Sequence, residues 1–249
     1  MFKWLRPFLR PGKRKSRFRR FVMAPIFWLG LIGLGVGTAG FLYFQGRALT
    51  FSFKDLERLP ERTLVYDRKG GSMGYVTGHG ENRVSVSIDE VSPFFVTALL
   101  AREDSRFYEH GGVDYRGVGR AAVSNVKAGG FEQGASTITM QLARNTWGLK
   151  QRTLARKFQE VALAQRLERK LEKDEILEHY MNRVYFGSGL YGIERASQGF
   201  FMKPASELTL GESAMLAGVI RGPSLLNPFR SIDSAKGVRD EVLDRLVAE

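Results

Sequence analysis

Acidic, basic, hydroxyl and amide side chains gather in three clusters between Glu103 and Glu160. The first cluster begins at Glu103, the second runs from Gly134 to Asn145, and the third runs from Arg156 to Glu160. Each cluster lies beside an apolar pattern that can hold it on a rigid element, and a catalytic site needs such rigid support. This stretch is therefore the first candidate for chemistry.

Glu103 is a candidate general base. Phe107 follows four residues later, so the two side chains would share one face of a helix. A carboxylate that lies against an aromatic ring loses hydration and accepts a proton more readily. A solvated glutamate in a polar turn is the simpler explanation, and these two residues alone favour it.

The third cluster has the residue types of a phosphate site. Arg156, Lys157 and Glu160 are spaced i, i+1 and i+4, so a helix would present them on one side. Two neighbouring cations can hold a phosphate or diphosphate, and the planar guanidinium of arginine suits that ligand. An exposed helix face with an Arg156–Glu160 ion pair explains the same spacing, and it is favoured while the cluster is taken alone.

Hydroxyl side chains open the second cluster at Ser136 and Thr137. If a helix begins here, its first N–H groups and these hydroxyls point at one spot, which favours an anion. Gln141 and Asn145 are four residues apart and could both face that spot. Ser136 could equally be a plain N-cap.

Metal and thiol chemistry have little support in the sequence. Cysteine is absent, so disulfides and thiol nucleophiles are excluded. His79, His110 and His179 do not have the spacing of zinc ligands, and we expect His110 to form a local structural hydrogen bond. A Ser-x-x-Lys match at residues 124–127 is attributed to chance, because no Lys-[Ser/Thr]-Gly follows it.

Helical patterns dominate after residue 92. Ser92-Pro93 is a typical helix start, and Thr209 with Glu212 forms a capping box. Strand patterns are nearly absent from this region, so the main domain is predicted to be mainly α. We expect helices over residues 93–103, from 136 or 137 through 142, from 153 to about 170, over 174–181, over 213–220 and over about 233–247.

A membrane anchor and a short β linker are predicted before this domain. Residues 21–44 contain no charged side chain, and as a helix they would be about 36 Å long, enough to cross a hydrocarbon core of about 30 Å. Strand patterns occupy residues 63–66, 73–76 and 82–88. The predicted parts are a basic tail at 1–20, a transmembrane helix at 21–44, a linker at 45–91 and the main domain at 92–249.

The charge distribution predicts the orientation of the anchor. The net charge is +12, and most of the excess lies in residues 1–20, which contain no Asp or Glu. The positive-inside rule then places the N-terminus in the cytoplasm and the main domain outside it. A cleaved signal peptide is the alternative, although no clear small-x-small cleavage site follows the long apolar run. Because the remaining chain is nearly balanced in charge, we expect no nucleic-acid partner.

Four motifs in a fixed order are more specific than any single cluster. They read E-D-x-x-F-x-x-H-x-G from Glu103, G-x-S-T-I-T-x-Q-L-x-[KR]-N from Gly134, R-K-x-x-E from Arg156 and K-x-x-I-L-E-x-Y-x-N from Lys173. This order resembles the peptidoglycan glycosyltransferase family, glycosyltransferase family 51. That family forms the transglycosylase domain of class A penicillin-binding proteins and of monofunctional transglycosylases. The resemblance runs from about residue 60 to the end of the chain, with a weaker fifth match at Arg239.

Two positions depart from the family pattern. Met140 stands where the family usually has Gln, and Arg144 stands where Lys is usual. Arg144 keeps the positive charge, so contact with a phosphate stays plausible. Met140 removes an amide, which puts one polar contact in doubt but not the chemistry.

The resemblance implies a lysozyme-like α fold that polymerises lipid II into glycan strands and releases undecaprenyl diphosphate. Glu103 would be the general base, with inversion at the anomeric carbon, and Glu160 would be a second catalytic residue. The substrate-binding residues that it implies are Asp104, Phe107, Ser136, Thr137, Gln141, Arg144, Asn145, Arg156, Lys157 and Arg221. The structural residues that it implies are His110, Gly112 and Asn182.

The resemblance also implies partners. These are lipid II, the growing lipid-linked glycan chain and the membrane, and a homo-oligomer or a cell-wall synthesis complex is allowed. A divalent cation, Mg or Mn, is allowed as a cofactor, with its ligands left unknown. The sequence leaves open whether a transpeptidase domain follows in a longer protein.

Two other functions are kept as alternatives. The first is a lysozyme-like cell-wall hydrolase or lytic enzyme that uses Glu103 as an acid. The Arg/Lys cluster argues against it, because a sugar leaving group carries no phosphate to neutralise. The second is a non-enzymatic bitopic scaffold, in which Glu103 would have no role.

Overall fold

The computed structural model describes residues 24–59, 63–76, 83–130, 134–149, 151 and 153–248. The chain divides into two compact units, Met1–Arg47 and Ala48–Glu249, and each is described by itself. The predictions for the basic tail at 1–20, for residues 21–23 and for His79 lie outside the described residues. The predicted boundary between linker and main domain, at residue 92, stays a prediction.

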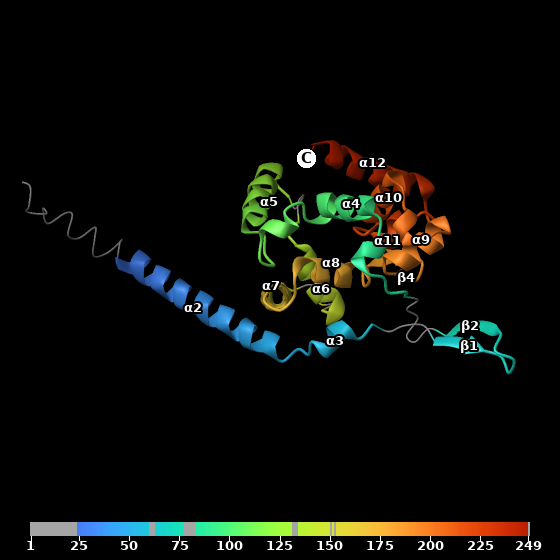
Figure 1. Ribbon diagram of the computed structural model, residues 1–249. Helices are drawn as coiled ribbons and strands as arrows, with labels where there is room; N and C mark the ends of the chain where they lie inside the picture. Colours follow the sequence, from blue (N-terminus) through green and yellow to red (C-terminus); the bar gives the residue numbers. More distant parts are fainter. Residues whose placement is uncertain are drawn as a thin grey trace, which may run out of the picture. The chain divides into compact units, whose positions relative to one another are not determined.

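The first unit contains most of helix α2 (Ala24–Leu49), drawn in blue in Figure 1. Residues Pro25–Leu49 of this helix are long and apolar enough to cross a membrane. The prediction of an apolar helix is confirmed for its described part, but the helix continues past residue 44. The residues that follow, Gln45 to Leu49, include no proline and only Gly46 as a weak helix former, so nothing local stops the helix earlier.

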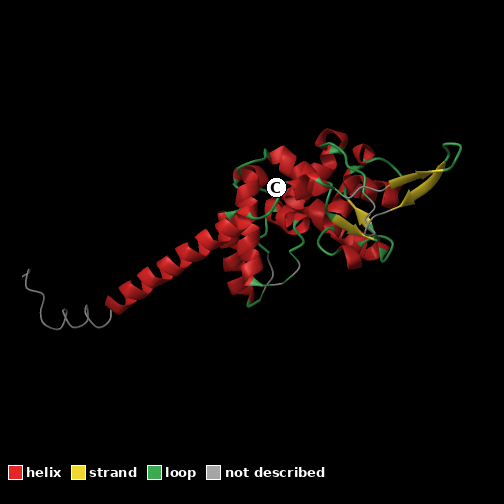
Figure 2. Ribbon diagram, turned by 90° about the horizontal axis from the view of Figure 1, so that it is seen from below, coloured by secondary structure: helices red, strands yellow, loops and turns green. Residues whose placement is uncertain are grey.

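Helices form most of the second unit, and strands are limited to two short hairpins among the described residues (Figure 2). The predicted mainly α class is therefore confirmed. The helices are α3 (Lys54–Glu57), α4 (Pro93–Glu103), α5 (Tyr115–Ala128), α6 (Ile138–Thr146), α7 (Leu154–Glu168), α8 (Lys173–Met181), α9 (Ile193–Phe201), α10 (Leu210–Val219), α11 (Pro223–Leu226) and α12 (Ile232–Ala248). The 3-10 turns are η3 (Ile88–Glu90), η4 (Phe107–Glu109) and η5 (Ala205–Glu207).

Capping side chains explain where several predicted helices begin. The hydroxyl of Thr137 accepts a hydrogen bond from the Met140 N–H and so caps α6. Thr153 caps α7 in the same way through the Arg156 N–H. A capping box of Thr209 and Glu212 opens α10, as predicted. The starts of α6 and α7 confirm the sequence-based assignments to within a residue or two, whereas α10 begins at Leu210, three residues before the predicted 213.

α10 is the central helix of one packed group, and all of its residues from Ser213 to Val219 are buried. It packs against α4 and α12. Gly218 permits the close approach, because a Cβ there would lie 2.8 Å from the carbonyl oxygen of Val238 on α12. Phe95 and Leu99 of α4 are fully buried. Each such side chain contributes about 1.5–3 kcal/mol through the hydrophobic effect.

A second packed group consists of α6, α7 and α8, with α6 in contact with both of the others. Leu142 of α6, Leu163 and Leu167 of α7, and Ile176 and Leu177 of α8 are fully buried. This packing fixes the polar face of α6 relative to the start of α7. The second and third clusters of the sequence are therefore held on neighbouring helices.

The predicted strand at 82–88 is wrong for its described residues, 83–88. Residues 83–87 lie in no strand, and Ile88 begins the 3-10 turn η3. The backbone hydrogen bonds of this segment go to side chains instead of a neighbouring strand. Both the N–H and the carbonyl oxygen of Val86 pair with the Asn182 side-chain amide, at 3.0 and 2.8 Å. The Ile88 N–H donates to Glu178 at 3.0 Å.

The other strands form two antiparallel hairpins. β1 (Thr63–Tyr66) pairs with β2 (Ser72–Val76), as the strand and turn patterns predicted. Gly70, at φ +81°, adopts the left-handed conformation in the connecting turn. β3 (Tyr185–Gly187) and β4 (Leu190–Tyr191) form a second, shorter hairpin that the sequence did not predict.

Helices α5 and α9 were also missed by sequence reasoning. α5 contains Gly117 and Gly119 within its first turns, and glycine lowers helix propensity by about 1 kcal/mol. A local cap compensates, because the Asp114 carboxylate accepts a hydrogen bond from the Gly117 N–H at 2.9 Å. α9 begins at Ile193 after Gly192, without a side-chain cap that the sequence could reveal.

Candidate active site

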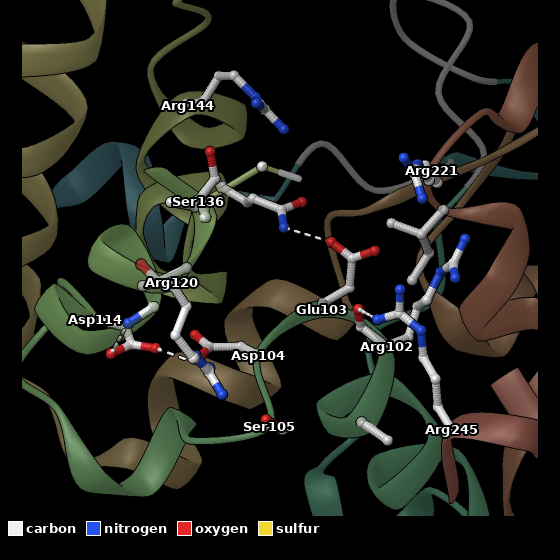
Figure 3. Close-up of a pocket in the computed structure, with 18 residues that line it drawn as sticks. Arg102, Glu103, Asp104, Ser105, Asp114, Arg120, Ser136, Arg144, Arg221 and Arg245 are labelled. Atoms are coloured by element: carbon white, nitrogen blue, oxygen red, sulfur yellow. Dashed lines mark hydrogen bonds and ion pairs between the residues drawn. The ribbon is translucent and has the colours of Figure 1, made fainter. Parts of the chain in front are cut away.

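A cavity of about 640 Å³ opens between α4, α5, α6 and the C-terminal part of α12 (Figure 3). Seven of the predicted site residues line it: Glu103, Asp104, Ser136, Thr137, Gln141, Arg144 and Arg221. Other lining residues were not predicted, namely Arg102, Ser105, Asp114, Arg120 and Arg245 among the polar ones. Residues of all three sequence clusters therefore meet in or beside one cavity.

Glu103 is the last residue of α4, and its carboxylate faces Arg221 across the cavity (Figure 3). Its Oε2 atom accepts a hydrogen bond from Gln141 Nε2 at 2.6 Å, drawn as a dashed line at Glu103 in the same figure. Gln141 in turn accepts a hydrogen bond from the hydroxyl of Tyr180 at 3.1 Å. The Gln141 amide of α6 is thus fixed between Glu103, the candidate base, and Tyr180 of α8.

The prediction that Glu103 and Phe107 share one face of a helix is wrong. α4 ends at Glu103, with Asp104 as its C-cap, and Phe107 lies in the separate turn η4. Phe107 is buried and does not line the cavity; its ring contacts those of Tyr108 and His110 edge-on. Because α4 ends at Glu103, the four-residue spacing to Phe107 does not place the two side chains on one helix face.

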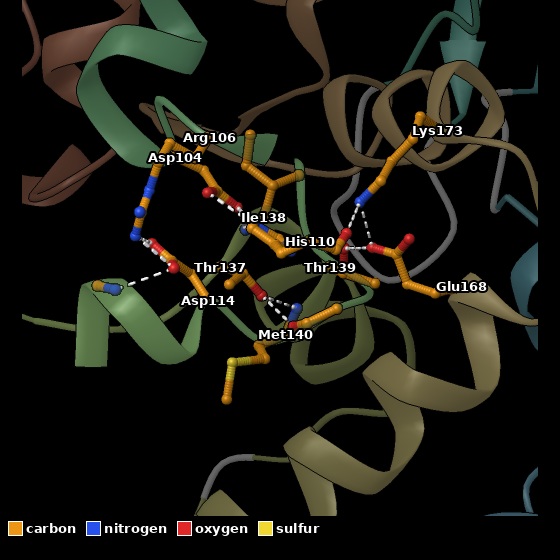
Figure 4. A network of polar contacts seen from close by, with 12 residues as sticks. Asp104, Arg106, His110, Asp114, Thr137, Ile138, Thr139, Met140, Glu168 and Lys173 are labelled. Atoms are coloured by element: carbon orange, nitrogen blue, oxygen red, sulfur yellow. Dashed lines mark hydrogen bonds and ion pairs between the residues drawn. The ribbon is translucent and has the colours of Figure 1, made fainter. Parts of the chain in front are cut away.

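Asp104 and His110 form a buried pair that supports α6 (Figure 4). His110 Nε2 lies 2.9 Å from Asp104 Oδ1, and Asp104 Oδ2 accepts a hydrogen bond from the Ile138 N–H at 3.0 Å. Asp104 was predicted to bind substrate, but its carboxylate is occupied by His110 and by the first N–H of α6. This placement gives Asp104 a supporting role next to Glu103.

The network continues from His110 to α7 and α8 (Figure 4). Lys173 Nζ donates to the carbonyl oxygen of His110 at 2.5 Å and to Glu168 at 2.8 Å. Thr139 of α6 donates to the same Glu168 oxygen at 2.6 Å. The loop that follows Glu103 is therefore joined to both α7 and α8 by polar contacts.

Thr137 and Gly112 hold the start of α6 against the loop. The buried Thr137 hydroxyl donates to the carbonyl oxygen of Gly112 at 2.7 Å while it caps the helix. Gly112 has φ +86°, and a Cβ there would lie 3.0 Å from the Ala164 backbone. Only glycine fits both the conformation and the close approach.

Met140, which replaces the family's usual Gln, is buried in the core and so requires no polar partner.

Ser136 connects the cavity to the third cluster. Lys157 Nζ donates to Ser136 Oγ at 2.6 Å and lies 3.4 Å from Glu160 Oε2. Arg156 donates to Glu160 Oε1. Burial lowers the pKa of Lys157, and the neighbouring Glu160 opposes that shift. Lys157 itself does not line the cavity, and it reaches the cavity wall through Ser136.

Glu160 is a buried carboxylate, 1% exposed, with a cation at each oxygen. Arg156 occupies Oε1 and Lys157 occupies Oε2, so Glu160 has no open oxygen for a divalent ion. No group of three or more His, Asp or Glu side chains is placed to hold a metal within the described part of the chain. The described residues therefore do not fit a metal held by the protein alone.

Arg144 and Arg221 present guanidinium groups to the cavity. Neither group makes an ion pair or hydrogen bond to another side chain in the part of the chain that is described. Arg245 donates to the carbonyl oxygen of Arg102 at 3.3 Å, and Arg102 pairs with Glu241 at 3.1 Å. The result is positive charge on both sides of Glu103.

Asp114 and Arg106 form a further pair at the cavity's edge, with Arg106 Nη2 2.5 Å from the carboxylate. Burial favours a higher pKa for Asp114, but the hydrogen bonds from Arg106 and the Gly117 N–H outweigh it and lower the pKa. The Asp114–Tyr115 sequence before an amphipathic stretch is an N-cap signal that could have indicated α5 and this pair.

Two further predicted residues, Asn145 and Asn182, also lie away from the cavity. Asn145 is exposed near the end of α6 and does not line the cavity, whereas Arg144 does. Asn182 follows α8, where its amide binds the Val86 backbone as described above. Arg102 and Arg245 gave no sequence signal, because they meet only when α12 packs against α4.

The geometry suits a particular class of reaction. A carboxylate with one oxygen held by an amide leaves its second oxygen for a hydroxyl, whose proton it can accept. Guanidinium groups near that carboxylate can stabilise a negative charge that develops on a leaving group. The cavity therefore fits the transfer of a group from an anionic leaving group to a hydroxyl acceptor.

Comparisons with known proteins agree with this chemistry. The family model described as "Transglycosylase" matches residues 69–247. The chain is 48% identical over 217 residues to Penicillin-binding protein 1A of Escherichia coli (strain K12), which covers 85% of this chain and 25% of that protein. It is 39% identical over 193 residues to Penicillin-binding protein 4 of Bacillus subtilis (strain 168), which covers 78% of this chain and 31% of that protein.

The chain spans about a quarter to a third of the length of these curated relatives. A crystal structure of Penicillin-Binding Protein 1A from Haemophilus influenzae aligns with 76% of this chain and 18% of that chain, at 23% identity and a TM-score of 0.42. That score is too low to bear on the fold.

Proposed function

Because the chain belongs to the transglycosylase family, we propose that it is a peptidoglycan glycosyltransferase that polymerises lipid II and releases undecaprenyl diphosphate. The observation that carries this proposal is the cavity in which Glu103 lies between the guanidinium groups of Arg144 and Arg221, which pair with no other side chain among the described residues. A base for a hydroxyl and cations for a diphosphate are the two requirements of this reaction.

Glu103 acts as the general base in the proposed reaction. Its free oxygen accepts the proton of the acceptor sugar hydroxyl while the hydroxyl oxygen attacks the anomeric carbon of the lipid-linked chain. The new C–O bond forms on the face opposite the departing group, so the configuration inverts. The bond between the anomeric carbon and the diphosphate oxygen breaks, and the diphosphate leaves with the electron pair.

Arg144 and Arg221 neutralise the departing diphosphate in this proposal. Both guanidinium groups are open to the cavity, and arginine binds phosphate oxygens in a bidentate manner. Lys157 and Arg156 supply further charge at the Ser136 wall, where Glu160 fixes their ammonium and guanidinium groups. Glu160 is thus a positioning residue in this proposal, in line with the assisting role that the family resemblance implied.

The lipid substrate suits an anchored enzyme. α2 is long and apolar enough to hold the chain in a membrane, and lipid II is itself a membrane lipid. The basic residues before α2 favour an N-terminus in the cytoplasm and a catalytic domain outside it. The proposed location is the cytoplasmic membrane, with assembly into a homo-oligomer or a cell-wall synthesis complex left as a further expectation.

The hydrolase and scaffold alternatives are not favoured. A hydrolase releases a sugar that carries no phosphate, so its reaction does not need guanidinium groups on both sides of the acid. A scaffold does not need a cavity lined by a carboxylate and guanidinium groups. Incubation with finished peptidoglycan distinguishes a hydrolase from the proposed transferase, because a hydrolase would release soluble muropeptides.

Polymerisation of lipid II in detergent by the purified chain tests the proposal. We expect wild type to form glycan polymer and Glu103→Gln to lose at least about 100-fold in rate, because general-base catalysis contributes that much or more. Glu207→Gln is the matched control, since Glu207 is exposed on η5 outside the cavity, and it should retain wild-type rate. Wild-type rate in Glu103→Gln would contradict the proposal.

A further inference from the structure

Tyr180 is a fully buried tyrosine whose hydroxyl reaches the candidate active site. It lies on α8 with 0% of its surface exposed, and α8 packs against α6. Its hydroxyl donates to Gln141 Oε1 at 3.1 Å, and Gln141 Nε2 donates to Glu103 Oε2 at 2.6 Å. Two hydrogen bonds therefore connect the core of the domain to the base.

The direction of these bonds follows from the chemistry of the amide. A glutamine amide has one acceptor end and one donor end, and the ionised carboxylate of Glu103 can only accept. If the Gln141 amide were reversed, its oxygen would face the carboxylate and repel it. A tyrosine hydroxyl that donates to Oε1 favours the orientation in which Nε2 faces Glu103.

Tyr180 can keep this donor role across the working pH range. Burial raises its pKa well above the ordinary value, and the negative charge of Glu103 adds to the shift. The phenol therefore stays protonated. Gln141 is itself buried, which leaves its amide little freedom to turn.

We propose that Tyr180 and Gln141 form a two-bond relay that positions the general base: the tyrosine orients the amide, and the amide orients the carboxylate. The relay occupies Glu103 Oε2 and leaves the other oxygen for the acceptor hydroxyl. Gln141 is then a positioning residue, not a residue that chiefly binds substrate. This inference rests on the proposed function, since it needs Glu103 to be the base.

The sharpest test is Tyr180→Phe, which keeps the ring and removes the hydroxyl. We expect kcat for lipid II polymerisation to fall about tenfold, the effect of one hydrogen bond, with KM little changed. Tyr185→Phe is the matched control, since Tyr185 lies on β3 away from the cavity.

A second variant, Gln141→Met, distinguishes loss of the relay from a general loss of packing around Tyr180. In a Gln141→Met background, Tyr180→Phe should cause no further loss of kcat, because the amide that it orients is gone. The same fold-loss in both backgrounds, or a wild-type kcat in Tyr180→Phe, would overturn the relay.

The outcome also distinguishes the relay from the proposed function. If wild type polymerises lipid II, Glu103→Gln does not, and Tyr180→Phe equals wild type, only the relay fails. If wild type forms no polymer, the proposed function fails and the relay fails with it.

Discussion

Glu160 shows at the scale of a single residue how much depends on one buried carboxylate. Its two oxygens hold Arg156 and Lys157, and Lys157 in turn holds Ser136 at the cavity wall. Glu160 is nearly fully buried, whereas the side chains of Arg156 and Lys157 are partly exposed. A change at this position therefore acts on stability and on the phosphate-binding groups together.

We expect Glu160→Ala to lower the free energy of unfolding by about 3 kcal/mol, because it leaves two cations without their shared buried partner. Urea denaturation followed by circular dichroism measures this change. Glu160→Gln keeps the shape and part of the hydrogen bonding, so it should cost less. Equal stability of all three proteins would show that the buried pair contributes nothing.

The charge of Lys157 predicts how activity depends on pH. Burial lowers the pKa of Lys157 below that of an exposed lysine. As the pH rises through this lowered pKa, the ammonium loses its proton and its attraction for the diphosphate. The alkaline loss of polymerisation rate should therefore begin at lower pH than an ordinary lysine would give.

Lys157→Arg tests this assignment, because a guanidinium stays protonated throughout the accessible range. Initial rates of lipid II polymerisation from pH 6 to about 10.5 should show the alkaline limb moving to higher pH in the variant. An alkaline limb at the same pH in both proteins would assign it to another group.

At the scale of elements, the position of α6 depends on its contact with the loop after α4. Two hydrogen bonds hold the helix start there, from the Ile138 N–H to Asp104 and from Thr137 to Gly112, while Thr137 also caps the helix itself. The same helix carries Gln141 and Arg144 into the cavity. A displacement of the helix start would therefore move the partner of the base.

Gly112→Ala should destabilise the protein by about 1–3 kcal/mol, because the new Cβ meets the Ala164 backbone in a left-handed conformation. It should also reduce polymerisation, because the Thr137–Gly112 contact shifts. Gly119→Ala is the matched control within α5, where a Cβ meets no atom within 4 Å. That variant should be as stable as wild type or more stable by about 0.5–1 kcal/mol. Thermal unfolding of the two variants measures the difference.

At the scale of the whole molecule, the proposed function requires α2 to cross the membrane and Glu103 to lie outside the cytoplasm. The apolar helix by itself predicts no orientation, and the basic residues before it predict that the N-terminus lies in the cytoplasm. We expect a reporter enzyme that is active only outside the cytoplasm to be active when fused after the chain's C-terminus. The same reporter fused before residue 1 should be inactive.

Neutral substitutions of Lys and Arg in residues 1–20 should lower the fraction of correctly oriented chains in this assay. The C-terminal reporter signal would fall and the N-terminal signal would rise. An active N-terminal reporter in the unaltered protein would reverse the proposed topology.

Local patterns determined the apolar helix α2 and most helix starts, and they predicted the candidate reacting groups. The apolar run of α2 and the caps of α6, α7 and α10 depend on residues within one turn of each other, so they can be seen in the sequence. The ordered motifs likewise indicated Glu103 as the candidate base and the Arg/Lys cluster as the candidate phosphate site. Segments with glycines or weak caps, such as α5 and α9, gave no comparable signal.

Only the tertiary structure decided which of these residues face one another. Gln141 meets Glu103 across 38 positions and Tyr180 meets Gln141 across 39, while Asn145 is exposed and Phe107 is buried away from the base. Arg245 reaches Arg102 across 143 positions because α12 packs with α4. Such contacts depend on how helices pack, and packing is set by side chains from the whole domain, so local spacing cannot reveal it.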